Sequence, residues 1–103
     1  MRILAIERDV PGADPRQMQP HLEEEAAAVW ALAKRDLLRD ACFTVADHRA
    51  VLLLECGGEA EAREALRSLP LCREGLIEFD VLALRPYDGF ERLFRDDARS
   101  EKV

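Results

Sequence analysis

The chain has 103 residues, enough for one domain with a modest hydrophobic core and too few for two. Its formal net charge of -6 at pH 7 argues against binding to nucleic acid, because nucleic-acid-binding proteins concentrate positive charge on one surface. With 49% hydrophobic residues and no apolar run near the roughly 20 residues that cross a bilayer, we expect a globular protein that does not span a membrane.

The amino-terminal residues and the cysteines indicate where the protein works. The start of the chain meets a charge early and lacks the small-residue cleavage site of a signal peptide, so we expect a cytoplasmic protein. Three cysteines, Cys42, Cys56 and Cys72, fit neither the C-x-x-C spacing of a redox pair nor the spacing of zinc ligands. We therefore expect reduced, mostly buried thiols and no bound metal.

The first third of the chain predicts a strand and then a long helix. Residues 1–8 alternate between two faces, both partly apolar, which is typical of a central strand: Met1, Ile3, Ala5 and Glu7 on one, and Arg2, Leu4, Ile6 and Arg8 on the other. Asp14 and Gln17 have the spacing of a capping box and predict a short turn over residues 15–19. The main helix is predicted from Pro20 to Arg39, with a buried stripe of Leu22, Ala26, Val29, Trp30, Ala33 and Leu37.

The rest of the chain predicts a hairpin, a second helix and a final strand. Two β-rich runs, Ala41–Ala46 and Arg49–Cys56, flank a turn at Asp47 and His48. A helix follows from Glu59 to Ser68. After a turn at Gly75, the last strand has one wholly apolar face and one mixed face: Ile77, Phe79, Val81 and Ala83 against Glu78, Asp80, Leu82 and Leu84.

The carboxyl-terminal segment is too apolar to be a free tail. Phe90, Leu93 and Phe94 have the spacing of one helical turn, and we expect this turn to pack on a partner subunit. The predicted domain therefore covers residues 1–95, and residues 96–103 are expected to form a flexible tail.

The order strand, helix, strand, strand, helix, strand predicts an α+β protein of the ferredoxin-like type. This fold is a four-stranded antiparallel sheet with two helices on one face. The second face of the sheet would include Leu4, Ile6, Leu82 and Leu84. Because so much exposed apolar surface is unfavourable, we expect a dimer that packs sheet against sheet.

Several short motifs resemble muconolactone delta-isomerase and its relatives among the dimeric α/β-barrel proteins. They are Leu69-Pro70-Leu71, Ile77-Glu78-Phe79-Asp80 and Arg85-Pro86, with weaker support from Ala46-Asp47-His48 and Asp14-Pro15. The resemblance covers most of residues 1–88. It implies a cofactor-free, cytoplasmic homo-oligomer that moves a proton on a small organic acid or lactone. The isomerases have a polar, lysine-bearing first strand where this chain has Leu4 and Ile6.

Candidate chemistry is concentrated in the last strand. Isomerisation next to a carbonyl group needs a base, a proton donor and a group that holds the enolate. Glu78 is the candidate base, with Asp80 on the same face and His48 as a possible proton shuttle. Three arginines are candidates for binding a substrate carboxylate: Arg2, Arg8 and Arg85. The alternative for each is a structural role, as an interface ion pair or a solvent-facing turn residue.

Two other functions are compatible with the same fold. A non-catalytic ligand-binding or assembly module would keep the dimeric barrel without a polar site, and the apolar Leu4 and Ile6 favour this alternative. A cofactor-free monooxygenase would have an apolar pocket without a paired acid and base. The sequence contains no Ser-His-Asp order, Gly-rich phosphate loop or metal-ligand cluster.

Overall fold

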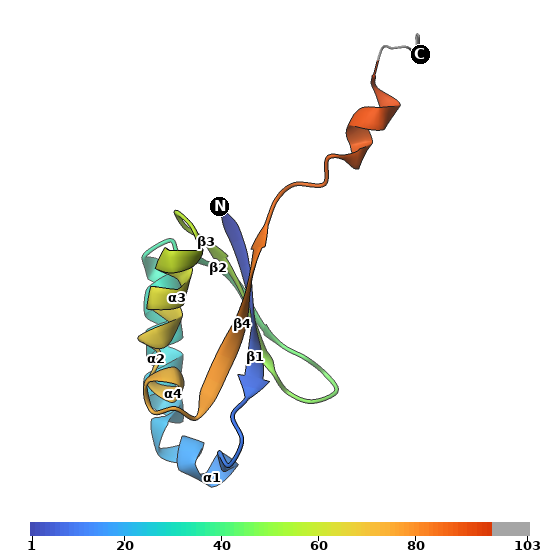
Figure 1. The fold of residues 1–103 in the computed structure, drawn as a ribbon. Coiled ribbons are helices and arrows are strands. Elements are labelled where there is room, and N and C mark those ends of the chain that lie inside the picture. The colour runs from blue at the N-terminus through green and yellow to red at the C-terminus, as the bar shows by residue number, and fades with distance from the viewer. Residues whose placement is uncertain (96–103) are drawn as a thin grey trace.

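Four strands form one antiparallel sheet, with a helical layer on one face only (Figure 1). The computed structural model describes residues 1–95. The strands are β1 (Arg2–Asp9), β2 (Leu38–Phe43), β3 (Ala50–Glu55) and β4 (Ile77–Leu84), in the spatial order β2-β3-β1-β4. The layer contains the two longer helices, α2 (Leu22–Lys34) and α3 (Glu59–Arg67). The predicted ferredoxin-like α+β fold is therefore confirmed.

Four short helical segments complete the chain. They are α1 (Pro15–Met18), η1 (Gln19–His21), α4 (Pro70–Arg73) and η2 (Gly89–Leu93). The capping box predicted before α1 is present: the backbone N–H of Arg16 donates to the Asp14 carboxylate at 2.8 Å, and Asp14 N–H donates to Gln17 Oε1 at 3.0 Å. No helix within residues 1–95 is long and apolar enough to cross a membrane.

The strand register separates a buried face from an open face. Ile3 lies opposite Leu54, and Ala5 lies opposite Leu52, all under the helices. These side chains form the core together with residues of the helices and of the segment after α3: Leu32, Ala62, Leu66 and Leu69. The predicted inward face of the first strand is thus confirmed for Ile3 and Ala5.

The opposite face of the sheet has no helical cover in the described residues (Figure 1). Leu4 is paired with Leu53 of β3 and Leu82 of β4, which places three apolar side chains in one row. Ile6 is next along β1, opposite Val51 and Asp80. We call this surface the open face; it is apolar in its middle and charged towards its ends.

Helix α2 ends earlier than its sequence pattern predicts. The helix was expected to reach Arg39, but Asp36 takes a left-handed conformation with φ of 63°. Asp36 N–H donates to the Ala33 carbonyl at 3.1 Å and Leu37 N–H to the Leu32 carbonyl at 3.0 Å, which is the Schellman motif. Strand β2 therefore begins at Leu38, before the predicted start at Ala41. The sequence did not reveal this end of α2, because an aspartate, Asp36, occupies the left-handed position that usually holds glycine.

The buried stripe of α2 also differs from the prediction. Leu32 is the fully buried residue of this helix, whereas Trp30 is 64% exposed and Leu22 is 43% exposed. Alanines surround the helix on several sides, so more than one stripe satisfies the helical period. The stripe that packs inward is the one centred on Leu32, with Ala28 and Val29 half-buried beside it.

Gly75 fixes the direction in which β4 starts. Its φ of 74° is accessible to glycine at little cost, and it ends α4 with a second Schellman motif. Leu76 N–H donates to the Leu71 carbonyl at 2.9 Å, and the two leucines pack together in a small second core. The predicted turn at Gly75 and the strand after it are confirmed.

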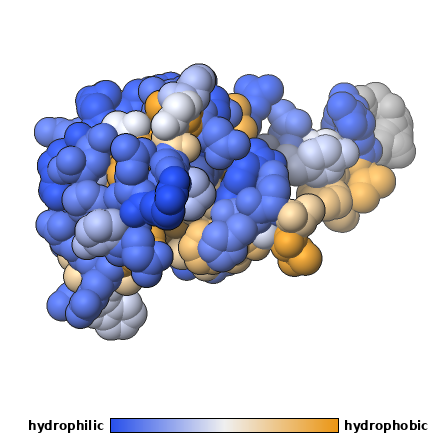
Figure 2. Space-filling model, turned by 90° about the horizontal axis from the view of Figure 1, so that it is seen from below, coloured by the Kyte–Doolittle hydropathy of each residue, from blue (hydrophilic) through white to orange (hydrophobic). Residues whose placement is uncertain are grey.

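After β4 the chain leaves the sheet as a projecting arm, residues 85–95 (Figure 1). The predicted last turn of helix is present as the 3₁₀ helix η2. Figure 2 shows hydrophobic residues along one side of the arm and hydrophilic residues along the other. The predicted tail, residues 96–103, lies outside the described residues.

Candidate functional site

Two carboxylates and one arginine meet at the end of the open face. A terminal nitrogen of Arg8 lies 2.7 Å from Glu78 Oε1, and Arg8 Nε lies 3.6 Å from Asp80 Oδ1. The cluster follows from the register, which pairs Arg8 of β1 with Glu78 of β4 and Ile6 with Asp80. Both carboxylate side chains are 57% exposed in the single chain. A ligand can therefore reach the cluster.

The other predicted site residues lie elsewhere on the sheet. Arg2 is at the opposite end of β1, six positions from Arg8, which corresponds to about 20 Å at roughly 3.3 Å per residue. Arg85 follows Leu84, the residue paired with Arg2, so these two arginines mark the far end of β4. The structure brings Glu78, Asp80 and Arg8 together, and it separates Arg2 and Arg85 from them.

His48 lies at the tip of the β2–β3 hairpin. Its φ is 55°, and its ring stacks on Phe43 with the ring centroids 4.0 Å apart. The turn is closed by hydrogen bonds between Thr44 and Arg49, and Asp47 accepts a hydrogen bond from the Thr44 hydroxyl, which holds the Asp47 pKa below its usual value. Strands β3 and β1 lie between the hairpin edge and β4, so His48 does not join the Glu78 cluster within one chain.

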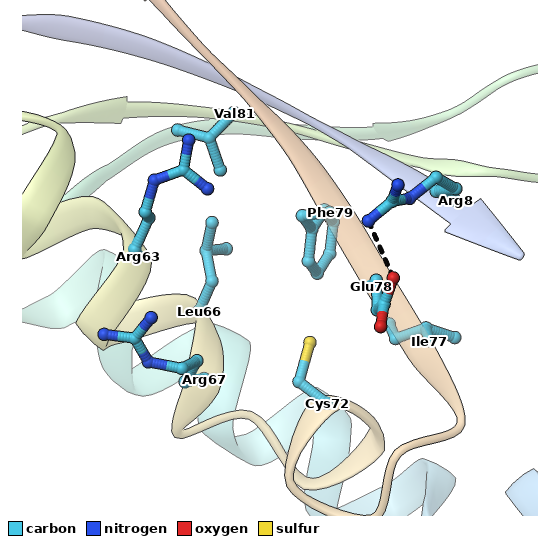
Figure 3. Close-up of a pocket in the computed structure, with 9 residues that line it drawn as sticks. All are labelled: Arg8, Arg63, Leu66, Arg67, Cys72, Ile77, Glu78, Phe79 and Val81. Atoms are coloured by element: carbon cyan, nitrogen blue, oxygen red, sulfur yellow. Dashed lines mark hydrogen bonds and ion pairs between the residues drawn. The ribbon is translucent and has the colours of Figure 1, made fainter. Parts of the chain in front are cut away.

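A groove of about 350 Å³ runs between helix α3 and strand β4, on the helical side of the sheet (Figure 3). Its floor is apolar, formed by Leu66, Phe79 and Val81. Arg63 and Arg67 stand on the helical side, and Arg8 with Glu78 closes the other end (Figure 3). This volume is at the lower end of the range for small-molecule sites.

The charge of the groove is opposite to that of the whole protein. Three arginines and one carboxylate line it, although the chain has a net charge of -6. Arg63 has an ion pair with Glu59 at 3.4 Å, whereas the structure gives Arg67 no ion pair with another described residue. An apolar floor with arginines at its rim suits a small organic anion, because a guanidinium group binds carboxylates through paired hydrogen bonds.

Cys72 lines the groove but is poorly suited to act as a nucleophile. Burial raises the pKa of its thiol to about 12, and the carboxylates of Glu25, Glu7 and Glu78 act in the same direction. Because the thiolate is the reactive form, this cysteine stays protonated and unreactive at neutral pH. The cysteines are free, as predicted, but they are less buried than expected, because Cys42 is exposed and Cys56 and Cys72 are half-buried.

Glu25 is a half-buried carboxylate that the sequence analysis did not single out. It accepts a hydrogen bond from the backbone N–H of Leu71 at 2.9 Å and so caps the start of α4. Burial raises the pKa of Glu25, and the hydrogen bond from Leu71 opposes that rise in part. Glu25 thus connects α2 to the segment that leads into β4.

The raised pKa of Glu25 gives stability a specific pH dependence. The folded state binds the proton more tightly than the unfolded state, so Glu25 contributes stability as the pH falls from 7 towards 5, above its ordinary value of 4.5. In urea unfolding, wild type is expected to gain stability relative to Glu25→Gln over this range. Glu23→Gln, a change at an exposed position of the same helix, is the matched control. The stability difference between wild type and Glu23→Gln should stay constant over this range. An equal response of the two variants would contradict the assignment.

The groove residues were missed because α3 was considered only as an amphipathic helix. Arg63 and Arg67 are four residues apart, on either side of the buried Leu66. That spacing was a signal that both cations border the same apolar surface. Within residues 1–95, no group of three or more His, Cys, Asp or Glu side chains is arranged to hold a metal ion.

An antiparallel sheet with helices on one face and a charged cluster on the other defines an α+β protein of the ferredoxin-like fold. Comparison with models of known protein families and with curated proteins found no match. Among solved structures, the chain is similar to 5-chloro-2-hydroxyhydroquinone dehydrochlorinase (TftG) from Burkholderia phenoliruptrix AC1100, in complex with 2,5-dihydroxybenzoquinone. The TM-score is 0.62 at 17% identity, covering 84% of this chain and 96% of the other. This similarity shows the fold alone.

Proposed function

We propose that this protein is a muconolactone-isomerase-like enzyme that moves a proton on a small organic acid or lactone without a cofactor. The observation that carries the proposal is the contact of Arg8 with both Glu78 and Asp80, beside the apolar side chains of the open face. A carboxylate next to a guanidinium group supplies a base and an anion-binding group at the same place.

The proposed reaction needs only these groups. Glu78 takes the proton from the carbon next to the substrate carbonyl, and the C–H electron pair passes into an enolate. Arg8 stabilises the negative charge of the enolate or holds the substrate carboxylate. The protonated Glu78 then returns the proton at the far carbon of the conjugated system, so that the double bond moves and no atom is gained or lost. Asp80 helps to hold Arg8 in position.

We further propose that the open face is covered by the same face of a second copy. Leu4, Leu53 and Leu82 form an apolar row at its centre, and Leu82 is 48% exposed in the single chain. Full burial of a leucine contributes about 1.5–3 kcal/mol, so pairing two such faces is favourable. The dimer also removes the Glu78 cluster from bulk water, which strengthens electrostatic interactions there.

A deuterium-exchange assay tests the activity. The protein is incubated in deuterated water with muconolactone and a panel of related unsaturated lactones and keto acids, and proton NMR follows the signal next to the carbonyl. Protein-dependent loss of that signal for at least one compound is the expected result. No exchange across the panel would contradict the isomerase proposal. The same assay on His48→Gln tests whether His48 contributes, which stays a prediction.

The groove beside α3 favours a second candidate function, the non-catalytic binding of a small organic acid. Benzoate is a suitable probe, because it combines a carboxylate with an apolar ring. We expect NMR shift changes at groove residues on titration and weaker binding, by about tenfold, in Arg67→Gln. Arg35→Gln, at the end of α2, is the control.

The monooxygenase alternative receives less support, because the open face carries a paired carboxylate and arginine.

A further inference from the structure

The projecting arm carries four large apolar side chains that nothing in the described chain covers. Their exposed fractions are 68% for Tyr87, 62% for Phe90, 72% for Leu93 and 81% for Phe94. Among residues 1–95, the backbone hydrogen bonds of η2 join the arm to itself, from Glu91 to Asp88 and from Phe94 to Glu91. Exposure on this scale marks a surface that binds a partner.

The arm is amphipathic. A 3₁₀ helix has about three residues per turn, so Phe90 and Leu93 of η2 fall in one line, and Tyr87, just before the helix, contacts Phe90. Asp88, Glu91, Arg92 and Arg95 border a separate polar surface. Figure 2 shows the two kinds of residue on different sides of the arm. One side of the arm is thus suited to an apolar partner and the other to water.

The apolar side is organised before any partner binds. The Tyr87 and Phe90 rings meet edge to face, with their centroids 4.9 Å apart. The Tyr87 ring also lies over Gly89, where an added Cβ would clash with the phenol ring. Gly89 therefore allows the tyrosine to fold back onto the arm. A preorganised aromatic cluster loses less conformational freedom on docking than a flexible tail does.

The direction of the arm excludes its own domain as the cover. Figure 1 shows the arm leaving the carboxyl end of β4 and extending away from both the sheet and the helical layer. The arm presents on the order of 500 Å² of apolar surface if large side chains bury roughly 150–250 Å² each. A stable dimer buries about 800 Å² on each partner. The arm alone falls short of this area, so a dimer that uses the arm needs further surface, which the open face offers.

We propose that two copies of this chain exchange their arms, each arm placing its aromatic side on the other copy. The inference rests on the second copy in the proposed function and does not depend on the proposed chemistry. Each copy thus covers the aromatic side of the other copy's arm, which its own domain leaves exposed. The assembly surface is therefore composite: the two open faces pack on each other, and each arm adds a separate contact with the other copy.

Photo-crosslinking of the full chain tests where the arm binds. Phe94 is replaced by p-benzoylphenylalanine. Arg35, at the carboxyl end of α2, receives the same replacement as a control. Illumination is expected to give covalent dimers on a denaturing gel from position 94 and few from position 35. Crosslinks confined to single chains, in a protein that sediments as a dimer, would overturn arm exchange and leave the sheet-to-sheet dimer intact.

Sedimentation equilibrium measures what the arm contributes. Phe90→Ser combined with Phe94→Ser is expected to raise the dimer dissociation constant by tenfold or more. Asp88→Ser combined with Arg92→Ser, on the polar side, should leave it within about twofold. Circular dichroism establishes that both variants fold. An unchanged dissociation constant in the aromatic variant would overturn the proposal, and a wild-type monomer at micromolar concentration would overturn the proposed dimer as well.

Discussion

Replacing Glu78 with glutamine is expected to lower the rate of deuterium incorporation by about 10²- to 10⁴-fold, the usual contribution of a general base. Glutamine has nearly the same shape and can still accept a hydrogen bond from Arg8, which lies 2.7 Å from Glu78 in the wild type. The change therefore removes the basic group with little disturbance of the sheet. The rate is measured by NMR in deuterated water with the substrate that gives the fastest exchange.

Two further variants separate chemistry from a general loss of charge. Glu64→Gln, exposed on α3, removes the same charge away from the cluster and should leave the rate unchanged. Arg8→Gln is expected to raise KM more than it lowers kcat if the guanidinium group binds the substrate carboxylate. Retention of more than half of the wild-type rate in Glu78→Gln would remove Glu78 as the base.

Leu54→Ala is expected to destabilise the protein by about 2–5 kcal/mol, the range for a buried leucine whose removal leaves a cavity. Leu54 is only 1% exposed and lies opposite Ile3 beneath the helices. Its neighbour Leu53 is only partly buried and points to the open face, so Leu53→Ala should cost less than half as much in the monomer. The two variants carry the same substitution at neighbouring positions, so they differ mainly in the face of the sheet from which a side chain is removed.

Urea unfolding at several protein concentrations measures both variants. If two open faces pack together, Leu53→Ala should weaken the dimer and so decrease the concentration dependence of the unfolding midpoint, whereas Leu54→Ala should lower the midpoint at every concentration. Equal free energies of unfolding in the two variants would contradict the assignment of the buried face. Unchanged concentration dependence in Leu53→Ala would contradict the sheet-to-sheet dimer.

The fold was predictable because alternation in the strands determines which side chains face the core. Ile3 and Ala5 share a face by the two-residue period of a strand, and Leu4 and Leu82 must then share the other. Helix α2 was less predictable. Its alanines satisfy several helical stripes at once, and its end depends on the left-handed conformation of Asp36, which no apolar pattern records.

The site was predictable only where it lies along the strands. Glu78 and Asp80 could be placed on one face of β4 from their spacing, but their contact with Arg8 depends on the register between β1 and β4. His48 was separated from them by the strand order, which places two strands between the hairpin edge and β4. The groove was not predicted, because it requires the position of α3 over β4.

The two edges of the sheet differ in whether they can accept another strand. The β2 edge has a register irregularity between Leu38 and Asp40 and carries charged residues there, features that block the addition of a further strand. The β4 edge ends in Leu82, Ala83 and Leu84 and has no such irregularity in its pairing with β1. The β4 edge is therefore better suited than the β2 edge to pair with another molecule. Two β4 edges that paired with each other would form a closed pair of molecules, with only the less regular β2 edges left for further growth.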